Sequence, residues 1–342
     1  MFPLAAYASL KDVASLAQVS FQTAGKVLNG TPDVRVSTVT ARRIFAAAET
    51  LHYRPNALAK SLLDGATATI GLLIADMTDA VSARVAVGVQ EEAARCGFAI
   101  LLASLPARDN NAADMLRILL ERRVDGVILE SPHLEEDHEF AEVARSVPAV
   151  VLQHVLGGRV PFIGSDDRQA GRIATEHLIE NGHRLIGSIT GPYRRRAVRS
   201  RLLGYEDALR VAGAVMGEDL VAEADWSAIG GAKAVRILLE REPRMTAVFV
   251  HSDEMAIGVL RELRSLGKRV PDDVAIIGCD DLPFAELLTP SLSSVRVPFV
   301  EIGRQAVTAL VGQISGRAPD EETLLPVSVS VRESSTCLVP GL

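Results

Sequence analysis

The sequence has few cysteines and no long apolar run. Its three cysteines, Cys96, Cys279 and Cys337, lie far apart without a CxxC pair, and this spacing argues against a disulfide framework and against a zinc site. No apolar run approaches the roughly 20 residues that a membrane-spanning helix needs. The segment Met1–Leu10 lacks the basic start and the longer apolar stretch of a secretory signal. We therefore expect a cytoplasmic protein with reduced cysteines, no metal site and no contact with a membrane.

Sequence motifs of common enzymes are also missing. There is no GxSxG elbow, no P-loop, no HExxH and no GxGxxG that opens a helix. The stretch 133–138 contains metal-ligating residue types, but their crowding in one acidic run is more typical of a solvated surface. We predict no catalytic residues, no enzyme activity and no cofactor.

Length and charge indicate more than one domain. The 342 residues exceed what one ordinary domain holds. The net charge of −7 is unevenly distributed, because residues 1–65 carry seven Lys or Arg against four acids and the remainder is strongly acidic. This asymmetry fits a small head that meets phosphates and a larger body that does not.

The N-terminal part of the sequence has the pattern of a small all-α domain. Apolar residues recur at helical spacing from Leu10 to Ala17. A second short helix capped by Ser20 follows almost at once, and a third helix, capped by Ser37 or Thr38, stops before Pro55. Two short helices joined by a tight turn are typical of a helix-turn-helix motif.

After Thr69, short β-rich runs alternate with longer helical ones, which is typical of parallel sheets with crossover helices. Strands are predicted at 70–74, 98–103, 126–129, 150–152, 185–189, 247–250 and 274–278. Helices are predicted at 83–96, 112–122, 169–180, 201–211, 232–239 and 255–266. Because about 270 residues exceed one compact sheet, we expect two α/β subdomains with a ligand-binding cleft between them, at the carboxyl ends of the strands.

The run DVASLAQVSFQTAGKVLNG over 12–30 closely resembles the DNA-binding motif of the lactose repressor (LacI/GalR) family, and the similarity continues through 52–56 and 59–62 into nearly the whole chain. The resemblance implies a helix-turn-helix domain at 9–55, a hinge helix and linker at 56–66, and a periplasmic-binding-protein-like domain at 67–340. It also implies a homodimeric transcriptional regulator, a repressor by expectation, that binds double-stranded operator DNA. A small-molecule effector bound between two lobes would control its affinity for DNA.

The resemblance assigns DNA contacts to the head and the hinge. Phe21, Gln22 and Lys26 occupy the family's base-reading positions, where glutamine can pair with adenine and lysine can donate to guanine. Leu62 matches the leucine that wedges into the minor groove at the centre of the operator, while core packing is the alternative role for Leu62 and for Phe21. The full set of predicted DNA-binding residues is Ser20, Phe21, Gln22, Thr23, Lys26, Asn29, Asn56, Ala59 and Leu62.

Several head residues depart from the family pattern. Gly25 stands where serine is usual, and a glycine inside a helix costs about 1 kcal/mol relative to alanine. Lys26 replaces an arginine, and Leu63, Asp64 and Ala66 replace a hinge end that is often basic. These departures predict weaker or more salt-sensitive DNA binding.

The resemblance also assigns the effector site, whose predicted residues are Asp76, Glu130, Gln153, Arg201, Trp226, Ser252, Asp253 and Asp280. Arginine only donates hydrogen bonds and aspartate only accepts them, so a converging pair can bracket vicinal hydroxyls. The aromatic Trp226 resembles the residue that packs on a sugar face in the lactose repressor itself. The segment 76–82 lacks the paired aromatics that stack on planar ligands in purine-sensing relatives. We therefore predict a sugar or sugar derivative as effector.

Three alternatives stay open at this point. The arginine run over 194–196 is compatible with an anionic effector, although such runs are more often solvated surface. His154 and His251 can hydrogen-bond a ligand or simply complete the rim of the cleft. A sugar-binding protein or an α/β enzyme without a DNA role would share the core fold.

Overall fold

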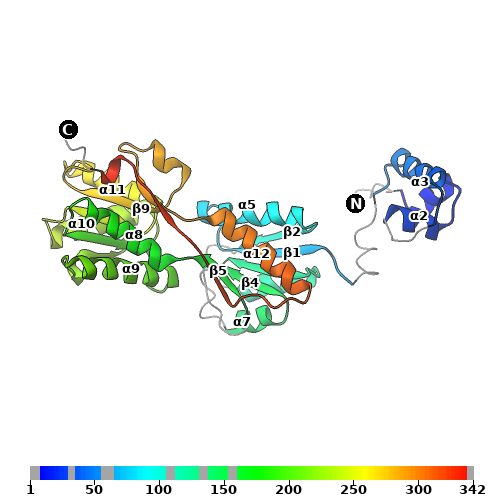
Figure 1. Cartoon of the computed structure of the whole chain (residues 1–342), viewed down its shortest axis with the longest axis horizontal. Coiled ribbons are helices and arrows are strands. Elements are labelled where there is room, and N and C mark those ends of the chain that lie inside the picture. The colour runs from blue at the N-terminus through cyan, green and yellow to red at the C-terminus, as the bar shows by residue number, and fades with distance from the viewer. Residues whose placement is uncertain are drawn as a thin grey trace, which may run out of the picture. The chain divides into compact units, whose positions relative to one another are not determined.

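The structure is a computed structural model that describes residues 8–29, 35–54, 65–104, 112–130, 138–152 and 160–336 (Figure 1). The chain divides into two compact units, Met1–Ala68 and Thr69–Leu342. Among the described residues, no helix is both long and apolar enough to cross a membrane.

The N-terminal unit contains three helices, as the periodicity predicts. They are α1 (Leu10–Leu16), α2 (Phe21–Leu28) and α3 (Thr38–Thr50). The side chain of a serine caps each helix by accepting a backbone N–H bond: Ser9 for α1, Ser20 for α2 and Ser37 for α3. Their small core is formed by Val13, Ala14, Ala17, Ala24, Ile44, Ala47 and Ala48. The predicted hinge helix at 57–63 lies outside the described residues.

The second unit contains two lobes, each built on a six-stranded sheet. The first sheet has the order β11-β5-β4-β3-β1-β2, and all its neighbouring strands are parallel. Its strands are β1 (Thr69–Ile74), β2 (Ala99–Ser104), β3 (Gly126–Glu130), β4 (Ala149–Leu152), β5 (Phe162–Ser165) and β11 (Glu322–Leu325). The helices of this first lobe are α5 (Ala80–Arg95), α6 (Ala112–Glu121), α7 (His138–Arg145) and α12 (Phe299–Ile314).

The sheet of the second lobe has the order β12-β10-β9-β8-β6-β7, with β12 antiparallel to β10 and the other pairs parallel. Its strands are β6 (Ile186–Thr190), β7 (Val221–Glu223), β8 (Ala247–Val250), β9 (Ala275–Asp280), β10 (Ser293–Arg296) and β12 (Ser328–Ser330). Its helices are α8 (Asp167–Glu180), α9 (Arg196–Ala212), α10 (Ala228–Arg241) and α11 (Asp253–Ser265), with short 3₁₀ turns η2 (Glu218–Leu220), η3 (Pro283–Leu287) and η4 (Glu333–Ser335). The structure thus confirms the predicted fold class of a helical head and two parallel α/β subdomains.

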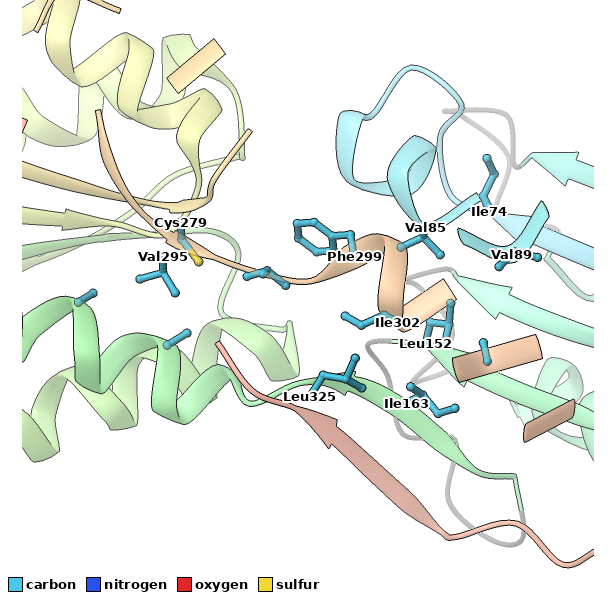
Figure 2. Packing of buried hydrophobic residues seen from close by; sticks show 14 of the residues in the cluster. Ile74, Val85, Val89, Leu152, Ile163, Cys279, Val295, Phe299, Ile302 and Leu325 are labelled. Atoms are coloured by element: carbon cyan, nitrogen blue, oxygen red, sulfur yellow. The ribbon is translucent and has the colours of Figure 1, made fainter. Parts of the chain in front are cut away.

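The chain passes between the lobes at three places: between β5 and α8, between β10 and α12, and between β11 and β12. One hydrophobic core extends across these crossings. In Figure 2, Phe299 and Ile302 at the start of α12 lie between Val295 of the second lobe and Leu152 of the first. The lobes are therefore joined by a shared apolar core at the crossings and not by one linker.

Candidate DNA-binding and effector sites

Helix α2 presents the predicted base-reading side chains to solvent. Phe21 is 52% exposed, and Gln22 and Lys26 are also exposed, while Ala24 on the opposite face is fully buried in the head. The exposure of Phe21 excludes the alternative in which it packs in the core of its own domain. These three side chains are available to the edges of bases in a major groove.

The other predicted DNA contacts are only partly described. The hydroxyl of Ser20 accepts the backbone N–H of Thr23 at 3.1 Å, so this serine already serves as the N-cap of α2. Asn29 is exposed at the C-terminal end of the same helix. The remaining three predicted contacts, Asn56, Ala59 and Leu62, lie outside the described residues.

The unusual Gly25 sits where α2 packs on α1. A Cβ atom built at this position would lie 3.2 Å from a methyl carbon of Leu10. The side chain of Leu10 thus takes up part of the space that a serine needs, which gives the glycine a packing reason.

In the second lobe, Arg201 is the best-anchored member of the predicted effector site. It lies on α9 and is only 6% exposed. Its Nε donates to Asp167 Oδ1 at 2.9 Å and its Nη1 donates to the carbonyl of His251 at 2.6 Å. Burial works against the charged form, but attraction to neighbouring groups that include Cys279, Asp167 and Asp280 raises the pKa of Arg201 above its usual value.

Close packing of α8 on α9 sets the position of this arginine. A Cβ atom built on Gly204 would lie 1.9 Å from the carbonyl oxygen of Arg168, and one built on Gly171 would lie 1.9 Å from the carbonyl oxygen of Arg201. Only glycine permits this approach of the two backbones. The sequence-based search missed Asp167, the partner of Arg201 on α8, because β5, which precedes it, was not predicted.

The two aspartates predicted for the second lobe have different surroundings. Asp280 is the last residue of β9 and has a left-handed φ of 119°. Its pKa is raised well above the usual range, first by burial and then by the negative charges of Asp253 and Asp79, although the charge of Arg201 lowers it. Asp253 is fully buried, and both its carboxylate oxygens accept internal hydrogen bonds, from Ser294 Oγ at 2.6 Å and from the backbone N–H of Leu282 at 2.8 Å. A direct effector contact of Asp253 stays a prediction, and these bonds show that its carboxylate also holds the loop after β9.

Ser252 and Trp226 also flank strand ends of the second lobe. Ser252 caps α11 by accepting the N–H of Met255 at 3.2 Å. Trp226 has a left-handed φ of 69°, and its ring packs so closely on Gly191 that a Cβ atom there would lie 2.2 Å from the ring. The indole is half-buried and keeps an accessible part.

In the first lobe, Glu130 ends β3 and is 4% exposed. Its Oε2 accepts from Ser82 Oγ at 2.8 Å and from the N–H of Ala75 at 3.3 Å. Burial raises the pKa of Glu130 to about 7. Asp76 is exposed, and its Oδ1 accepts the N–H and the hydroxyl of Thr78, both at 2.7 Å. The predicted contact Gln153 lies outside the described residues.

Charges from both lobes act on one another at these strand ends. Burial is the largest cause of the raised pKa of Glu130. Among the charges, that of Asp79 on the first lobe raises this pKa further, while that of Arg195 on the second lobe lowers it. Asp79 also raises the pKa of Asp280 across the lobes. Asp79 and Glu130 of the first lobe with Arg195, Arg201 and Asp280 of the second form what we call the interlobe cluster. The sequence analysis named Glu130, Arg201 and Asp280 as effector contacts and Arg195 within the arginine run over 194–196, but it missed Asp79.

His251 belongs to the structure of the second lobe. It is fully buried, and its Nε2 lies 3.1 Å from the hydroxyl of Ser188. Burial, followed by the charge of Arg201, lowers the pKa of His251 well below its usual value. Within the part of the chain that the structure describes, no group of three or more His, Cys, Asp or Glu residues could hold a metal ion.

Comparison with known proteins agrees with this arrangement. Residues 9–56 match the family described as bacterial regulatory proteins, lacI family, and residues 175–335 match a periplasmic binding protein-like domain. The ribose operon repressor of Escherichia coli (strain K12) is 34% identical over 90% of this chain and 93% of its own length. Catabolite control protein A of Priestia megaterium is 31% identical over 96% of this chain and 99% of its own length.

A solved structure titled as the lac repressor dimer bound to operator and the anti-inducer ONPF is similar over 96% of this chain and 99% of its own, with a TM-score of 0.88 and 26% identity. The named relatives regulate transcription, and none of these names describes an enzyme. A DNA-reading head followed by a two-lobed sensing domain, matched along nearly the whole chain, shows that the protein belongs to the lacI family of bacterial transcriptional regulators.

Proposed function

We propose that the protein is a homodimeric repressor that binds two-fold operator DNA and is controlled by a neutral sugar bound at the interlobe cluster. The observation that carries the proposal is this cluster, which combines the buried carboxyl group of Glu130 in the first lobe with the buried Arg201 and Asp280 in the second, and in which Asp79 and Arg195 act electrostatically across the lobes. The exposed face of α2 supplies the DNA-reading surface.

The chemistry of the cluster favours a ligand with several hydroxyl groups. The described hydrogen bonds of Glu130 all involve Oε2, which leaves Oε1 to accept from a ligand hydroxyl. Asp280 offers a second acidic group and Trp226 an apolar face on which a sugar ring can stack. Solved relatives support this class of ligand, since one structure similar over 96% of this chain, with a TM-score of 0.72 and 34% identity, is titled a transcriptional regulator CelR–cellobiose complex.

The arginine run offers less support for an anionic effector at this site. Arg196 pairs with Glu322 at 2.6 Å and lies 4.5 Å above the ring of Phe162. Arg199 donates to the carbonyls of Tyr193 and Arg194. The guanidinium groups of Arg196 and Arg199 are thus occupied by the protein itself. Of the arginine run, only Arg195 is a member of the interlobe cluster, where the three acidic groups outnumber it and Arg201, and this balance favours a neutral ligand.

The proposed mechanism is a shift between two arrangements of the lobes. An effector that contacts residues of both lobes favours the arrangement in which those contacts form together. In a two-fold dimer this change would alter the spacing of the two hinge segments, where Leu62 is proposed to enter the minor groove. The coupling between effector and operator is then a difference in operator affinity between the two arrangements.

The test combines two titrations of the full-length protein at fixed salt. Trp226 is the single tryptophan, so its fluorescence reports directly on the proposed site while a panel of neutral and acidic sugars is added. Fluorescence anisotropy of labelled operator DNA then measures the effect of each binding sugar on DNA affinity. We expect saturable fluorescence changes with neutral sugars and a matching change in operator affinity. Silence across the neutral sugars, or sugar binding without any effect on operator affinity, would refute the proposal.

A further inference from the structure

Asp281 is the first residue after β9 and directly follows the predicted effector contact Asp280. Its side chain is only 5% exposed, and it is not a member of the interlobe cluster. We propose that Asp281 is a positioning residue that couples effector binding to DNA binding, because its carboxylate joins the loop that carries Asp280 to two of the three crossings between the lobes. This inference rests on the function proposed above and names the link between the effector and the hinge.

Three side chains from two crossings converge on the carboxylate of Asp281. Arg296 is the last residue of β10, just before the crossing to α12, and its Nε donates to Oδ2 at 2.8 Å. Ser330 lies on β12, which follows the crossing from β11, and its hydroxyl donates to the same oxygen at 2.8 Å. Arg332, two residues further on, donates through Nη2 to Oδ1 at 2.7 Å. We call these four residues the crossing clamp.

The crossing clamp is held firmly on the side of Arg332. Its Nη1 donates to the carbonyl of Leu292 at 2.6 Å, and its backbone N–H donates to Ser293 Oγ at 2.7 Å. Burial acts to raise the pKa of Asp281, but the bonds from its three partners outweigh burial, and the pKa is lowered from its usual value. The carboxylate therefore makes charge-assisted bonds to both arginines, which are stronger than bonds between neutral groups.

The backbone of the loop after β9 transmits changes between neighbouring residues. Asp280 and Asp281 have φ angles of 119° and 53°, which residues other than glycine rarely adopt. Asp280 is in register with Arg296 on β10, and the N–H of Asp281 donates to Ser294 Oγ at 3.0 Å. Because the two aspartates adjoin in one constrained turn, a shift of the Asp280 carboxyl group toward a ligand changes the turn at Asp281 and with it the crossing clamp.

The crossings carry this change to the first lobe. Phe299, three residues after Arg296, begins α12 and packs in the core that the lobes share (Figure 2). Arg84 on α5 of the first lobe also reaches the loop, with its Nη1 3.4 Å from the carbonyl oxygen of Asp281. The first lobe begins with β1 at Thr69, directly after the N-terminal unit. A change in the crossing clamp is therefore passed to the lobe that follows the hinge segment.

Asp253 allows this role to be separated from a purely structural one. It holds the same loop from within the second lobe, because its Oδ2 accepts the N–H of Leu282 at 2.8 Å. Its Oδ1 accepts from Ser294 Oγ at 2.6 Å. Loss of the charge of Asp281 leaves both bonds in place. The effector contacts of the second lobe should then keep their positions while the link to the crossings weakens.

The test compares Asp281→Asn with the wild type as full-length proteins at fixed salt. Asparagine has the same shape and tolerates a left-handed φ, but its neutral amide accepts through one oxygen only and cannot hold both crossings. Trp226 fluorescence measures the affinity for neutral sugars, with ribose and cellobiose among the probes. Anisotropy of labelled operator DNA then measures operator affinity without sugar and at saturating sugar.

The quantity that decides is the coupling factor, the ratio of these two operator affinities, which is usually about 5- to 150-fold for coupled sites. We expect it to fall to near one in Asp281→Asn, while sugar affinity and operator affinity without sugar match the wild type. Arg296→Gln, which removes the partner at the β10 crossing, should lower the factor as well. The matched control is Asp273→Asn, an aspartate that pairs with Arg269 within the second lobe, and it should keep the wild-type factor.

An unchanged coupling factor in Asp281→Asn would overturn the inference. So would a loss of sugar affinity in this variant, because Asp281 would then belong to the effector site itself.

Hydrogen exchange of the ligand-free proteins gives a second measurement that does not depend on the effector. In Asp281→Asn we expect faster exchange than in the wild type at 297–302 and 328–332, and equal exchange at the N–H of Leu282, which Asp253 holds. If no sugar binds the wild type, the proposed effector is refuted and the exchange measurement alone decides the role of Asp281. Equal exchange at both crossings in the two proteins would then reject it.

Discussion

Replacement of Glu130 by glutamine should stabilise the protein at alkaline pH and weaken effector binding at the same time. The wild-type carboxyl is buried at the end of β3, where burial raises its pKa from 4.5 to about 7. Glutamine has nearly the same shape and its carbonyl oxygen can still accept from Ser82 and from the N–H of Ala75. The substitution therefore removes the charge and keeps the local hydrogen bonds.

The magnitude follows from proton linkage. The native state binds the proton of Glu130 more tightly than the unfolded state does. Below pH 4.5 the carboxyl group is protonated in both states, so proton binding takes no stability from the native state there. As the pH rises from there through about 7, stability is lost, by about 3 kcal/mol in total at roughly 1.4 kcal/mol for each pKa unit. Glu130→Gln should recover up to that amount at pH 8 and almost nothing near pH 4.5.

Urea unfolding of both proteins at pH 5 and pH 8 measures this difference directly. The matched control is Asp76→Asn, which neutralises an exposed carboxylate whose pKa is lowered by bonds from Thr78 and should give no gain at pH 8. A stability difference between Glu130→Gln and wild type that is the same at both pH values would refute the linkage argument.

The same variant tests the proposed ligand contact. The glutamine oxygen that keeps the bonds from Ser82 and Ala75 leaves the amide NH2 in the place of Oε1, where it cannot accept from a ligand hydroxyl, so Glu130→Gln should bind the effector about tenfold more weakly, which corresponds to about 1.4 kcal/mol. Tryptophan fluorescence titration measures this affinity. A purely structural role for Glu130 predicts the gain in stability without the loss of effector affinity.

Further predictions concern the head, the hinge and the helix packing. Gln22→Ala should cost about 1–3 kcal/mol in specific operator affinity and little in non-specific affinity, as competition binding at fixed salt can show. Leu62→Ser should leave circular dichroism and the melting temperature unchanged yet lower specific operator affinity several-fold, and equal affinity would reject the hinge assignment. Gly204→Ala should destabilise the second unit by about 1–3 kcal/mol, because the new Cβ atom meets the carbonyl oxygen of Arg168 at 1.9 Å. Gly312→Ala, a helical position with nothing within 4 Å of the new atom, serves as its control in thermal unfolding and should not destabilise.

The sequence by itself determined the features that depend on local interactions. The three helices of the head follow from apolar spacing and from serine caps, which act within a few residues of one another. The seven predicted strands are all present, and each is a continuous run of mainly apolar residues, as strands of parallel sheets usually are. The run over 12–30 also identified the family, because so long an ordered motif rarely arises by chance.

The strands near the edges of the two sheets could not be predicted from local sequence and became evident only in the tertiary structure. β10 has the sequence SSVR, and two of its serines are fully buried because they bond to other segments: Ser293 N–H donates to Ser334 Oγ, and Ser294 Oγ donates to Asp253. β11 and β12 come from a part of the chain that returns once to each lobe. No local apolar pattern records such partners, so these strands were not predicted.

The features of the effector site likewise fall into two groups, those predicted from the sequence and those recognised only in the folded structure. Arg201, Glu130 and Asp280 were predicted as effector contacts by the family resemblance. Only the folded chain shows that Asp253 turns both oxygens inward, that Asp167 holds Arg201, and that a charge from each lobe acts on Glu130. The physical reason is that a sequence orders residues along one chain, whereas burial and charge depend on groups that the fold brings together from distant segments.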